Sequence, residues 1–156
     1  MAYGLTSYLD SKISQRVLDR IEGHALILYD GECGFCQFWI QQVLRCDKKA
    51  YFLFSPLQAS WAKPLHSIAG RSLSLDTVIL IQDGRVYKKT RAVFRILGKL
   101  KFPINLFRLL LIVPAFICDP IYDLIAARRH FIKLSKKCDL PTPSERQRFL
   151  EDEFKT

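Results

Sequence analysis

The placement of two cysteines after a short apolar run constrains the fold of this chain more than any other feature of its sequence. Residues 25–29 read ALILY, which is typical of a buried strand, and the Asp30-Gly31 pair that follows is typical of a turn. Cys33 and Cys36 come next, and from there to about residue 46 apolar side chains recur at helical spacing. The sequence therefore predicts a strand, a turn and a helix, with both cysteines in the first turn of the helix.

Similar patterns predict the other elements of an α/β fold. We expect an amphipathic helix over residues 5–22 that stops near Gly23, a second strand at 51–54, helical structure over 57–69 interrupted at Pro64, a hairpin of residues 77–81 and 85–87 around Asp83-Gly84, a helix over 92–100, and short helices separated by Pro103, Pro114 and Pro120. After the first helix, the predicted order is β-α-β-α-β-β-α.

Length and composition indicate an ordinary globular protein. The chain has 156 residues, 49% of them hydrophobic, which is enough to build a core without disulfides or metal. Its five cysteines are odd in number and unequally spaced, which argues against a disulfide framework. Charged side chains interrupt residues 1–23, so we expect no secretory signal, and the apolar segment 106–118 is too short to span a membrane. We therefore expect a cytoplasmic protein.

The predicted position of the two cysteines has a chemical consequence. The amino end of a helix carries partial positive charge and unpaired N–H groups, which favour a thiolate and can lower a cysteine pKa from about 8.5 into a range of roughly 3.5 to 7.5. Cys33 is therefore a candidate nucleophile. Cys36 lies one helical turn further on, where it could attack a mixed disulfide on Cys33 and close an intramolecular disulfide.

Two other interpretations of the pair stay open at this point. Two cysteines can be inert core residues, and a Cys-x-x-Cys can form half of a zinc site. The zinc interpretation needs a second half, and the other possible ligands are scattered along the sequence: His24, His66, His130, Cys46, Cys118 and Cys138. We therefore expect thiol exchange and no metal.

The cysteine segment resembles the opening of the DCC family of predicted thiol-disulfide oxidoreductases, which is named for one aspartate and two cysteines. In this sequence these are Asp30, Cys33 and Cys36. Other similar segments are Phe54-Ser55-Pro56-Leu57-Gln58, Asp83-Gly84-Arg85-Val86-Tyr87, Pro114, Asp119-Pro120-Ile121-Tyr122-Asp123, Arg128-Arg129 and Cys138-Asp139-Leu140-Pro141.

The resemblance implies a thioredoxin-like β-α-β-α-β-β-α core with an N-terminal helix and additional C-terminal helices. It spans about residues 25–141, so we expect a helical extension at 1–24, a DCC-type domain at 25–141 and a tail at 142–156. It also implies disulfide exchange with a protein or small molecule that contains a disulfide or thiol. An external thiol reductant would reset the site, and no bound cofactor is needed.

Several further residues are candidates for the same site. Asp30 could cap the turn or relay the proton of Cys36, and in the second case it should face Cys36 or water, because a carboxylate beside Cys33 would disfavour the thiolate. Gly34 and Phe35, between the cysteines, are candidates for substrate binding. Asp76 and Thr77 are further candidates, because they precede the strand at Val78 where thioredoxins carry a cis-proline. The absence of that proline keeps open a non-catalytic module that binds a thiol-containing or anionic ligand.

The remaining cysteines and the nearby aromatic residues have simpler interpretations. We expect Cys46 and Cys118 to be structural cysteines of a helix end or core, and Cys138, in a basic neighbourhood, to be structural with a smaller chance of a redox role. Phe38 and Trp39 are expected in the core, because aromatic residues at helical spacing usually pack there.

The positive charge of the chain is concentrated in its second half. Residues 85–137 contain thirteen lysines and arginines, against only Asp119 and Asp123. A solvated helical surface is the simpler interpretation, and contact with an anionic membrane surface is the alternative. We expect no nucleic-acid partner, because the sequence has no zinc-finger spacing, RNA-binding signature or basic region followed by heptads.

Overall fold

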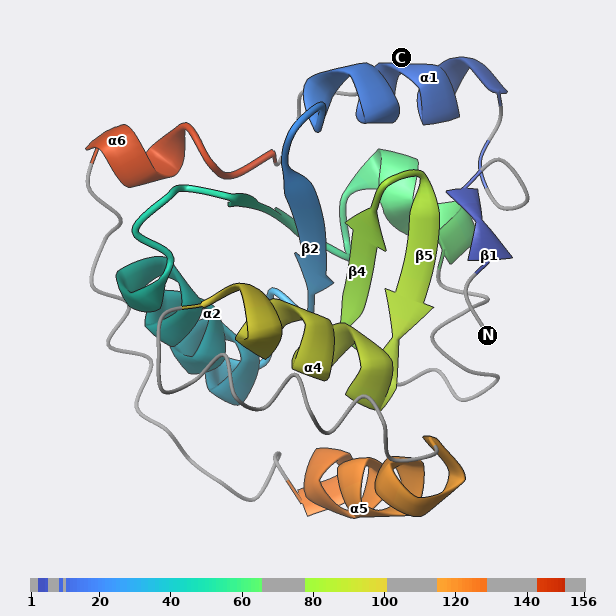
Figure 1. Cartoon of the computed structure of the whole chain (residues 1–156), viewed down its shortest axis with the longest axis vertical. Coiled ribbons are helices and arrows are strands. Elements are labelled where there is room, and N and C mark those ends of the chain that lie inside the picture. Colours follow the sequence, from blue (N-terminus) through green and yellow to red (C-terminus); the bar gives the residue numbers. More distant parts are fainter. Residues whose placement is uncertain are drawn as a thin grey trace.

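The computed structural model (Figure 1) describes residues 3–5, 9, 11–65, 78–100, 115–128 and 143–150. In chain order the elements are β1 (Tyr3–Gly4), α1 (Ser11–Arg20), β2 (Ala25–Tyr29), α2 (Gly34–Cys46), β3 (Phe52–Pro56), the 3-10 helix η2 (Ser60–Leu65), β4 (Ile79–Gln82), β5 (Arg85–Lys88), α4 (Lys89–Lys99), α5 (Ala115–Arg128) and α6 (Pro143–Arg146). The predicted β-α-β-α-β-β-α order is present from β2 to α4.

The strands form one mixed sheet with the order β1-β5-β4-β2-β3. β2 pairs with β3 in parallel, which requires the crossover that α2 supplies, and it pairs with β4 in the antiparallel sense. β4 and β5 form the predicted hairpin. Asp83 and Gly84 both have positive φ, 51° and 69°, as a type I′ turn requires. This is the thioredoxin-like α/β fold that the sequence predicts.

Both faces of the sheet are covered, and β2 shows this most clearly because all five of its residues are buried. Leu26 and Leu28 face a core shared with the N-terminal segment, α1 and η2, whereas Ala25, Ile27 and Tyr29 face a core shared with α2 and α4. A strand buried on both faces explains the continuous apolar run that the sequence contains. The cysteines belong to the second of these cores.

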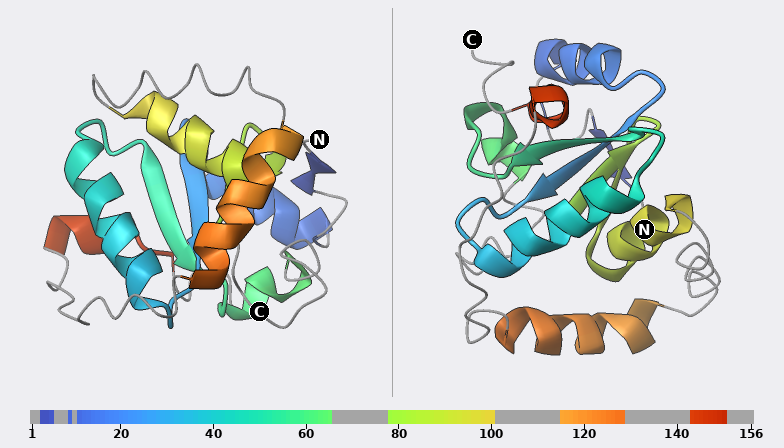
Figure 2. Two further views of the ribbon diagram at one scale, coloured as in Figure 1. Left: turned by 90° about the horizontal axis from the view of Figure 1, so that it is seen from below. Right: turned by 90° about the vertical axis from the view of Figure 1, so that its left-hand side faces the viewer.

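The helices form layers on either side of the sheet (Figure 2). α2 and α4 lie on one face, α1 and η2 lie on the other, and α5 lies beyond α4, away from the sheet. Lys89 of α4 and Asp123 of α5 form an ion pair of 2.8 Å, which joins the two helices. Among the helices of the described segments, none is both long and apolar enough to cross a membrane.

Three predictions about individual elements need correction. The helix predicted over residues 5–22 is described only from Ser11 to Arg20, and at its predicted start the Leu5 N–H donates to the Gly84 carbonyl (3.0 Å), next to the pairing of β1 with β5. Pro120 does not separate two helices, since α5 continues through it. Pro120 is the sixth residue of α5, beyond the four N–H groups at the start of a helix that have no helical partner, so α5 continues with one backbone hydrogen bond fewer. Residues 57–65 hold a short 3-10 helix that contains Pro64, and the rest of that predicted helix lies outside the described residues.

The segment after α6 packs against β3. The N–H of Phe54 donates to the Arg148 carbonyl (2.8 Å), and the N–H of Leu150 donates to the Phe54 carbonyl (2.7 Å). Leu150 is buried in the first core, and its carbonyl accepts a bond from the Ser55 hydroxyl. Residues 148–150 therefore cover the edge of β3, which would otherwise present unpaired backbone groups.

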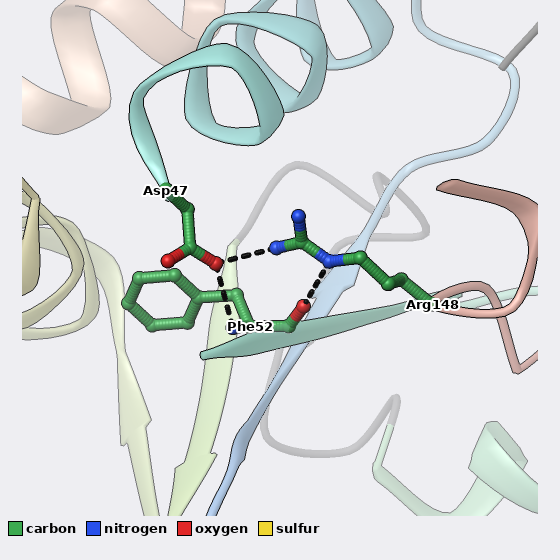
Figure 3. Close-up of polar contacts among 3 residues, drawn as sticks. All are labelled: Asp47, Phe52 and Arg148. Carbon is green, nitrogen blue, oxygen red and sulfur yellow. Dashed lines mark hydrogen bonds and ion pairs between the residues drawn. The ribbon is translucent and has the colours of Figure 1, made fainter. Parts of the chain in front are cut away.

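Arg148 also reaches the carboxyl end of α2 (Figure 3). Its guanidinium pairs with the carboxylate of Asp47, the residue that caps α2, and its Nε donates to the Phe52 carbonyl. The same carboxylate accepts the Phe52 N–H at 2.9 Å. Both side chains of the ion pair are largely buried, with 12% of Arg148 and 3% of Asp47 exposed. The ion pair thus ties α2 and β3 to the C-terminal segment.

Candidate active site

The two cysteines of the Cys-x-x-Cys pair lie where strand β2 leads into helix α2. Cys33 is the N-cap residue, with extended backbone angles (φ −86°, ψ 112°), and its carbonyl accepts the Gln37 N–H at 3.0 Å. Cys36 lies in the first turn of the helix. The Cys33 side chain makes no capping hydrogen bond to the described part of the chain, so its sulfur is not engaged in holding the helix end.

Both thiols are sheltered by the core between α2 and the sheet. Cys33 is 7% exposed and Cys36 is 4% exposed, and they pack in a cluster with Tyr29 and Ile40. Burial of Cys36 follows from the helical period, because Cys36, Ile40 and Val43 share the buried face of α2. Within the described segments neither cysteine forms a disulfide. A reagent must therefore reach sulfur atoms that present little surface.

Asp30 closes the turn between β2 and α2. Its Oδ1 accepts the N–H of Glu32 at 2.9 Å, an Asx turn in which the side chain bonds the backbone two residues on. The same oxygen accepts a bond from the Gln58 amide at 2.8 Å. Asp30 is itself buried, at 7% exposed. Of the two functions predicted for Asp30, the hydrogen bonds show the capping one directly.

Gln58, which follows the end of β3, holds this turn from the neighbouring strand. While its Nε2 donates to Asp30, its Oε1 accepts the Gly31 N–H at 3.1 Å. Gln37, one turn into α2, donates from its side-chain amide to the Gly31 carbonyl. Both backbone groups of Gly31 are thus bonded by glutamine side chains, and the turn that precedes Cys33 is fixed on two sides.

Glycine is required at position 31 because there is too little space for a side chain. A Cβ at this position would lie 3.2 Å from the Cβ of Pro56 and 3.2 Å from Oε1 of Gln58, closer than side chains usually approach. Only Gly23 and Gly84 are glycines with positive φ in the described segments. The close approach of β2 and β3 at this edge therefore explains Gly31.

Gln37 and Gln58 were not among the residues that the sequence analysis assigned to the site. A signal for Gln58 was present, because the carboxyl ends of two parallel strands meet at one edge of a sheet, and Gln58 follows β3 as Asp30 follows β2. Gln37 carries no comparable signal. A glutamine in a helix usually faces solvent, and only the folded turn places the Gly31 carbonyl within its reach.

The structure describes only some of the other residues predicted near this turn. Gly34 and Phe35, between the cysteines, are half-buried, and Phe35 packs against the second core. Trp39 is half-buried against the same core, as predicted, but Phe38 is wrongly predicted, because it is 44% exposed. Phe38 is two residues from buried Cys36 and so points to the opposite side of the helix. Asp76, Thr77 and Cys138 lie outside the described residues.

The remaining described cysteines lie apart from the turn along the chain. Cys46 is the last residue of α2 and packs half-buried against the second core, as expected of a helix-end cysteine, and Cys118 is half-buried on α5. No group of three or more His, Cys, Asp and Glu side chains in the described segments is arranged to hold a metal ion.

Comparison with known proteins places this turn in a wider context. Residues 27–134 match the family of DCC1-like thiol-disulfide oxidoreductases. The chain is 32% identical over 127 residues to the uncharacterized protein YuxK of Bacillus subtilis, covering 80% of this chain and 93% of the relative. It is 29% identical over 118 residues to a DCC family protein of Arabidopsis thaliana described as chloroplastic, covering 74% of this chain and 69% of the relative. No solved structure matches the chain.

Proposed function

The chain belongs to the DCC1-like thiol-disulfide oxidoreductase family, and we propose that it exchanges disulfides through Cys33 and Cys36. The observation that carries this proposal is the position of Cys33 as the N-cap of α2, with Cys36 one turn further on. This position directs the positive end of the helix dipole at the Cys33 sulfur and leaves Cys36 within the same turn. The Asx turn of Asp30 and the bonds from Gln37 and Gln58 fix the backbone from which Cys33 extends.

The proposed cycle transfers two electrons to the substrate disulfide. The Cys33 thiolate attacks one sulfur of that disulfide, a bond forms between Cys33 and this sulfur, and the other sulfur leaves as a thiolate that takes up a proton. The Cys36 thiol then loses its proton and attacks the Cys33 sulfur. The Cys33–Cys36 disulfide forms and the second substrate sulfur leaves as a thiol. An external thiol reductant restores the two thiols, and an excess of substrate thiol over disulfide would run the cycle in reverse.

In this proposal Asp30 has two functions. Its carboxylate caps the turn, and it accepts the proton that Cys36 loses in the second step. The Gln58 amide and the Glu32 N–H hold Oδ1 of Asp30, so the orientation of the carboxylate is set before the thiols react. A preset acceptor avoids reorganisation when the proton moves.

The burial of the two thiols limits which disulfides can reach them. With 7% of Cys33 and 4% of Cys36 exposed, little of either residue is within reach of a disulfide held inside a rigid folded protein. Small disulfides and disulfides in extended peptide segments fit this constraint. We also propose a reducing setting such as the cytoplasm, because the cycle depends on a thiol reductant and the odd number of cysteines favours thiols over structural disulfides.

A redox titration with trapping of free thiols tests the proposal. The full chain is equilibrated in glutathione buffers of graded potential, alkylated, and analysed by intact mass and peptide mapping. We expect a reversible Cys33–Cys36 disulfide in the wild type, a stable mixed disulfide on Cys33 in Cys36→Ser, and neither species in Cys33→Ser. Cys46→Ser serves as the matched control, since it removes a thiol from the far end of the same helix, and it should behave as the wild type.

Other outcomes would overturn the exchange mechanism. If no Cys33–Cys36 disulfide forms at any potential, or if Cys36→Ser accumulates no adduct, the two cysteines do not form an exchange pair. A non-catalytic module that binds a thiol-containing or anionic ligand would then be favoured. Its signature would be ligand binding that survives in the Cys33→Ser, Cys36→Ser double variant.

A further inference from the structure

Helix α4 presents a line of positive charge on its surface, which we call the α4 basic line. Its members follow one another at intervals of three and four residues, which places them on one side of the helix: Lys88, Arg91, Arg95 and Lys99. The first, second and fourth are exposed, and Arg95 is half-buried. Residues 84–100 contain no acidic residue. The line is therefore entirely positive along the whole helix.

The charges of the α4 basic line are not neutralised by the part of the chain that the structure describes. The neighbouring Lys89 pairs with Asp123 of α5 at 2.8 Å, but none of the four members of the line forms an ion pair with a carboxylate of the described residues. Like charges four residues apart on a helix repel one another. A negatively charged ligand bound along the line would relieve this repulsion.

Two members of the line are held in place by aromatic rings. The guanidinium of Arg95 lies 4.0 Å from the centre of the Tyr87 ring, and the ammonium of Lys99 lies 4.9 Å from the centre of the Tyr51 ring. The face of an aromatic ring attracts a cation without cancelling its charge. The two side chains are thus restricted before a ligand binds, which lowers the conformational entropy that binding would cost.

The α4 basic line begins at the edge of the sheet where the cysteines lie. In the sheet register, Leu28 of β2 pairs with Ile79 of β4, and Ile79 pairs with Lys88 of β5. Neighbouring strands are about 4.8 Å apart, so Lys88 lies about 10 Å from Leu28, near the end of β2 that leads to Cys33. Figure 1 shows the amino ends of α2 and α4 at this same edge. A segment bound along α4 therefore has one end at the edge where exchange is proposed.

The surroundings of the line favour an acidic peptide over other anionic partners. The exposed large apolar side chains of the described segments are on α2 and α5, so α4 has none to insert into a bilayer. Single-stranded nucleic acids stack their bases on exposed aromatic rings, but Tyr87, which contacts Arg95, is only 7% exposed. The carboxylates of a peptide need neither feature. A peptide also supplies the sulfur that exchange at the neighbouring edge requires.

We propose that the α4 basic line binds an acidic segment of the protein partner whose disulfide exchanges at Cys33. This inference rests on the proposed exchange function and adds the chemistry of the partner. From Lys88 to Lys99 the helix rises by about 16 Å, which an extended segment of about five residues spans. Aspartate and glutamate side chains of that segment would pair with the line, and the reacting cysteine would follow at the end near Lys88.

Fluorescence anisotropy with a redox-inert probe tests the docking by itself. The probe is a labelled ten-residue peptide with five glutamates and no cysteine, and it is compared with the same peptide carrying glutamines. In about 0.1 M salt the full chain should bind the glutamate peptide at least about tenfold more tightly, and about 1 M salt should remove the preference. Lys88→Glu with Arg91→Glu should weaken this binding by at least about tenfold, because each reversal replaces an attraction by a repulsion.

Lys12→Glu with Arg16→Glu is the matched control. Both residues are exposed on α1, which covers the opposite face of the sheet (Figure 2), and either double variant reverses two charges and so lowers the net charge from +9 to +5. At a Debye length of about 10 Å the control should bind the glutamate peptide within about twofold of the wild type. Thermal unfolding should be the same in all variants, which separates a binding defect from misfolding.

Exchange rates separate this inference from the exchange function itself. Both peptides are extended by a cysteine that carries a 2-thiopyridyl disulfide, so that release of thiopyridone reports attack by Cys33. The wild type should react at least about tenfold faster with the glutamate peptide, and only the α4 variant should lose this preference. If the wild type reacts equally with both peptides, the docking inference is wrong and the exchange function stands. If it reacts with neither although the glutamate peptide binds, the exchange function is wrong.

Two further results would overturn the docking inference. An equal loss of binding in the α1 control would show that the net charge of the chain, and not the α4 basic line, attracts the peptide. Tighter binding of a single-stranded DNA probe with five phosphates, lost in the α4 variant, would make the line a contact for nucleic acid.

Discussion

The two ends of helix α2 are held in different ways. At the amino end, uncharged amides of Gln37 and Gln58 bond the backbone of Gly31, and Gln58 also bonds the carboxylate of Asp30. At the carboxyl end, the largely buried ion pair of Asp47 and Arg148 fastens the helix to β3 and to the C-terminal segment (Figure 3). The amino end carries Cys33 and Cys36, and the carboxyl end carries an ion pair whose side chains are 12% and 3% exposed.

The two ends of α2 are thus held by different kinds of interaction, neutral amide hydrogen bonds at the amino end and an ion pair at the carboxyl end. Amide hydrogen bonds fix the turn before Cys33 without placing an additional formal charge beside a sulfur whose own charge changes during exchange. The ion pair lies at the other end of a helix of 13 residues, about 20 Å away, where its two opposite charges largely cancel in their effect on the thiols. The carboxyl end can therefore be disrupted to test stability, and the amino end to test reactivity.

The largest effect is expected from Arg148→Ala. This change leaves the Asp47 carboxylate, 3% exposed, without its cation, and it removes the donor to the Phe52 carbonyl. Removal of one partner of a buried pair costs about 3 to 5 kcal/mol, so urea denaturation should show a loss of that size. Under conditions where the variant is folded, the alkylation rate of Cys33 should stay within about fivefold of the wild type, because a carboxylate about 20 Å away acts on the thiolate with less than about 1 kcal/mol at an effective dielectric constant of about 20.

Two further variants control for the Arg148 result. Gln147→Ala alters the exposed neighbouring residue and should change stability by less than about 0.5 kcal/mol. Asp47→Asn combined with Arg148→Met keeps an acceptor for the Phe52 N–H and removes both charges, so it should recover much of the loss. A loss below about 1 kcal/mol for Arg148→Ala would show that the pair behaves as an exposed one.

Gly31→Ala is expected to have the second largest effect and to act at the other end of α2. The new methyl would press on the Pro56 ring and on Gln58 Oε1, each 3.2 Å away, and would displace the acceptor of the Gly31 N–H. Overpacking of this kind costs about 1 to 3 kcal/mol. Unlike Arg148→Ala, it should also change the alkylation rate of Cys33 in the folded protein, because it moves the turn that carries this residue.

Gly23→Ala is the matched control for this prediction. Gly23 has a positive φ of 75° and open space around its Cα, so alanine is strained there by its backbone and not by contacts. It should lose about 1 kcal/mol of stability and leave the alkylation rate unchanged. Equal rate changes in both glycine variants would show that the rate reports stability alone.

Local patterns in the sequence predicted the segment from β2 to α2, because an apolar run, Asp-Gly and a helical period are all properties of neighbouring residues. The hairpin followed from Asp83-Gly84 for the same reason. The contact between Asp47 and Arg148 joins residues 101 positions apart, so no pattern of neighbouring residues predicts it. The same is true of the bonds from Gln58 to Asp30 and Gly31. The prediction for Phe38 is wrong because helical spacing alone does not show which side of the helix faces the sheet.

A smaller effect is expected from Gln58→Ala. The change removes the donor to Asp30 Oδ1 and the acceptor of the Gly31 N–H, both at a partly exposed site where water can replace them. The net loss of stability should be about 1 kcal/mol. The rate of exchange with a small disulfide should fall, because the carboxylate of Asp30 loses the Gln58 amide, a group that orients it. Stopped-flow measurement of the first and second exchange steps would show whether the second step slows more.

Gln37→Ala gives a graded comparison, since it removes the bond to the Gly31 carbonyl and leaves the bonds of Gln58 to Asp30 and Gly31 in place. It should cost about 0.5 kcal/mol and leave the second exchange step unchanged. If the two glutamine variants slow that step equally, Gln58 acts through the backbone of the turn and not through Asp30.

The smallest effect is expected at Tyr51, between the carboxyl end of α2 and β3, in alkaline solution. Burial raises the pKa of the Tyr51 hydroxyl above its ordinary value, the charge of Asp83 adds to this, and a hydrogen bond with Gln82 opposes it. The folded state therefore holds this proton more tightly than the unfolded state does. The resulting stability is fully present below the unfolded pKa of the tyrosine hydroxyl, near 10, and it is lost as pH rises through the higher folded pKa. Tyr51→Phe removes this dependence.

The measurement is the difference in unfolding free energy between wild type and Tyr51→Phe at increasing pH, which cancels the titration of thiols and lysines common to both. The difference should be constant up to about pH 10 and then move in favour of the variant, because only the wild type loses the stability that the raised pKa of Tyr51 confers. The ammonium of Lys99 lies 4.9 Å from the Tyr51 ring centre, so Lys99→Gln in both backgrounds isolates the hydroxyl. If the difference in unfolding free energy stays constant above pH 10, the Tyr51 hydroxyl ionises as easily in the folded chain as in the unfolded one. The carboxyl end of α2 would then be more open to water than its buried ion pair implies.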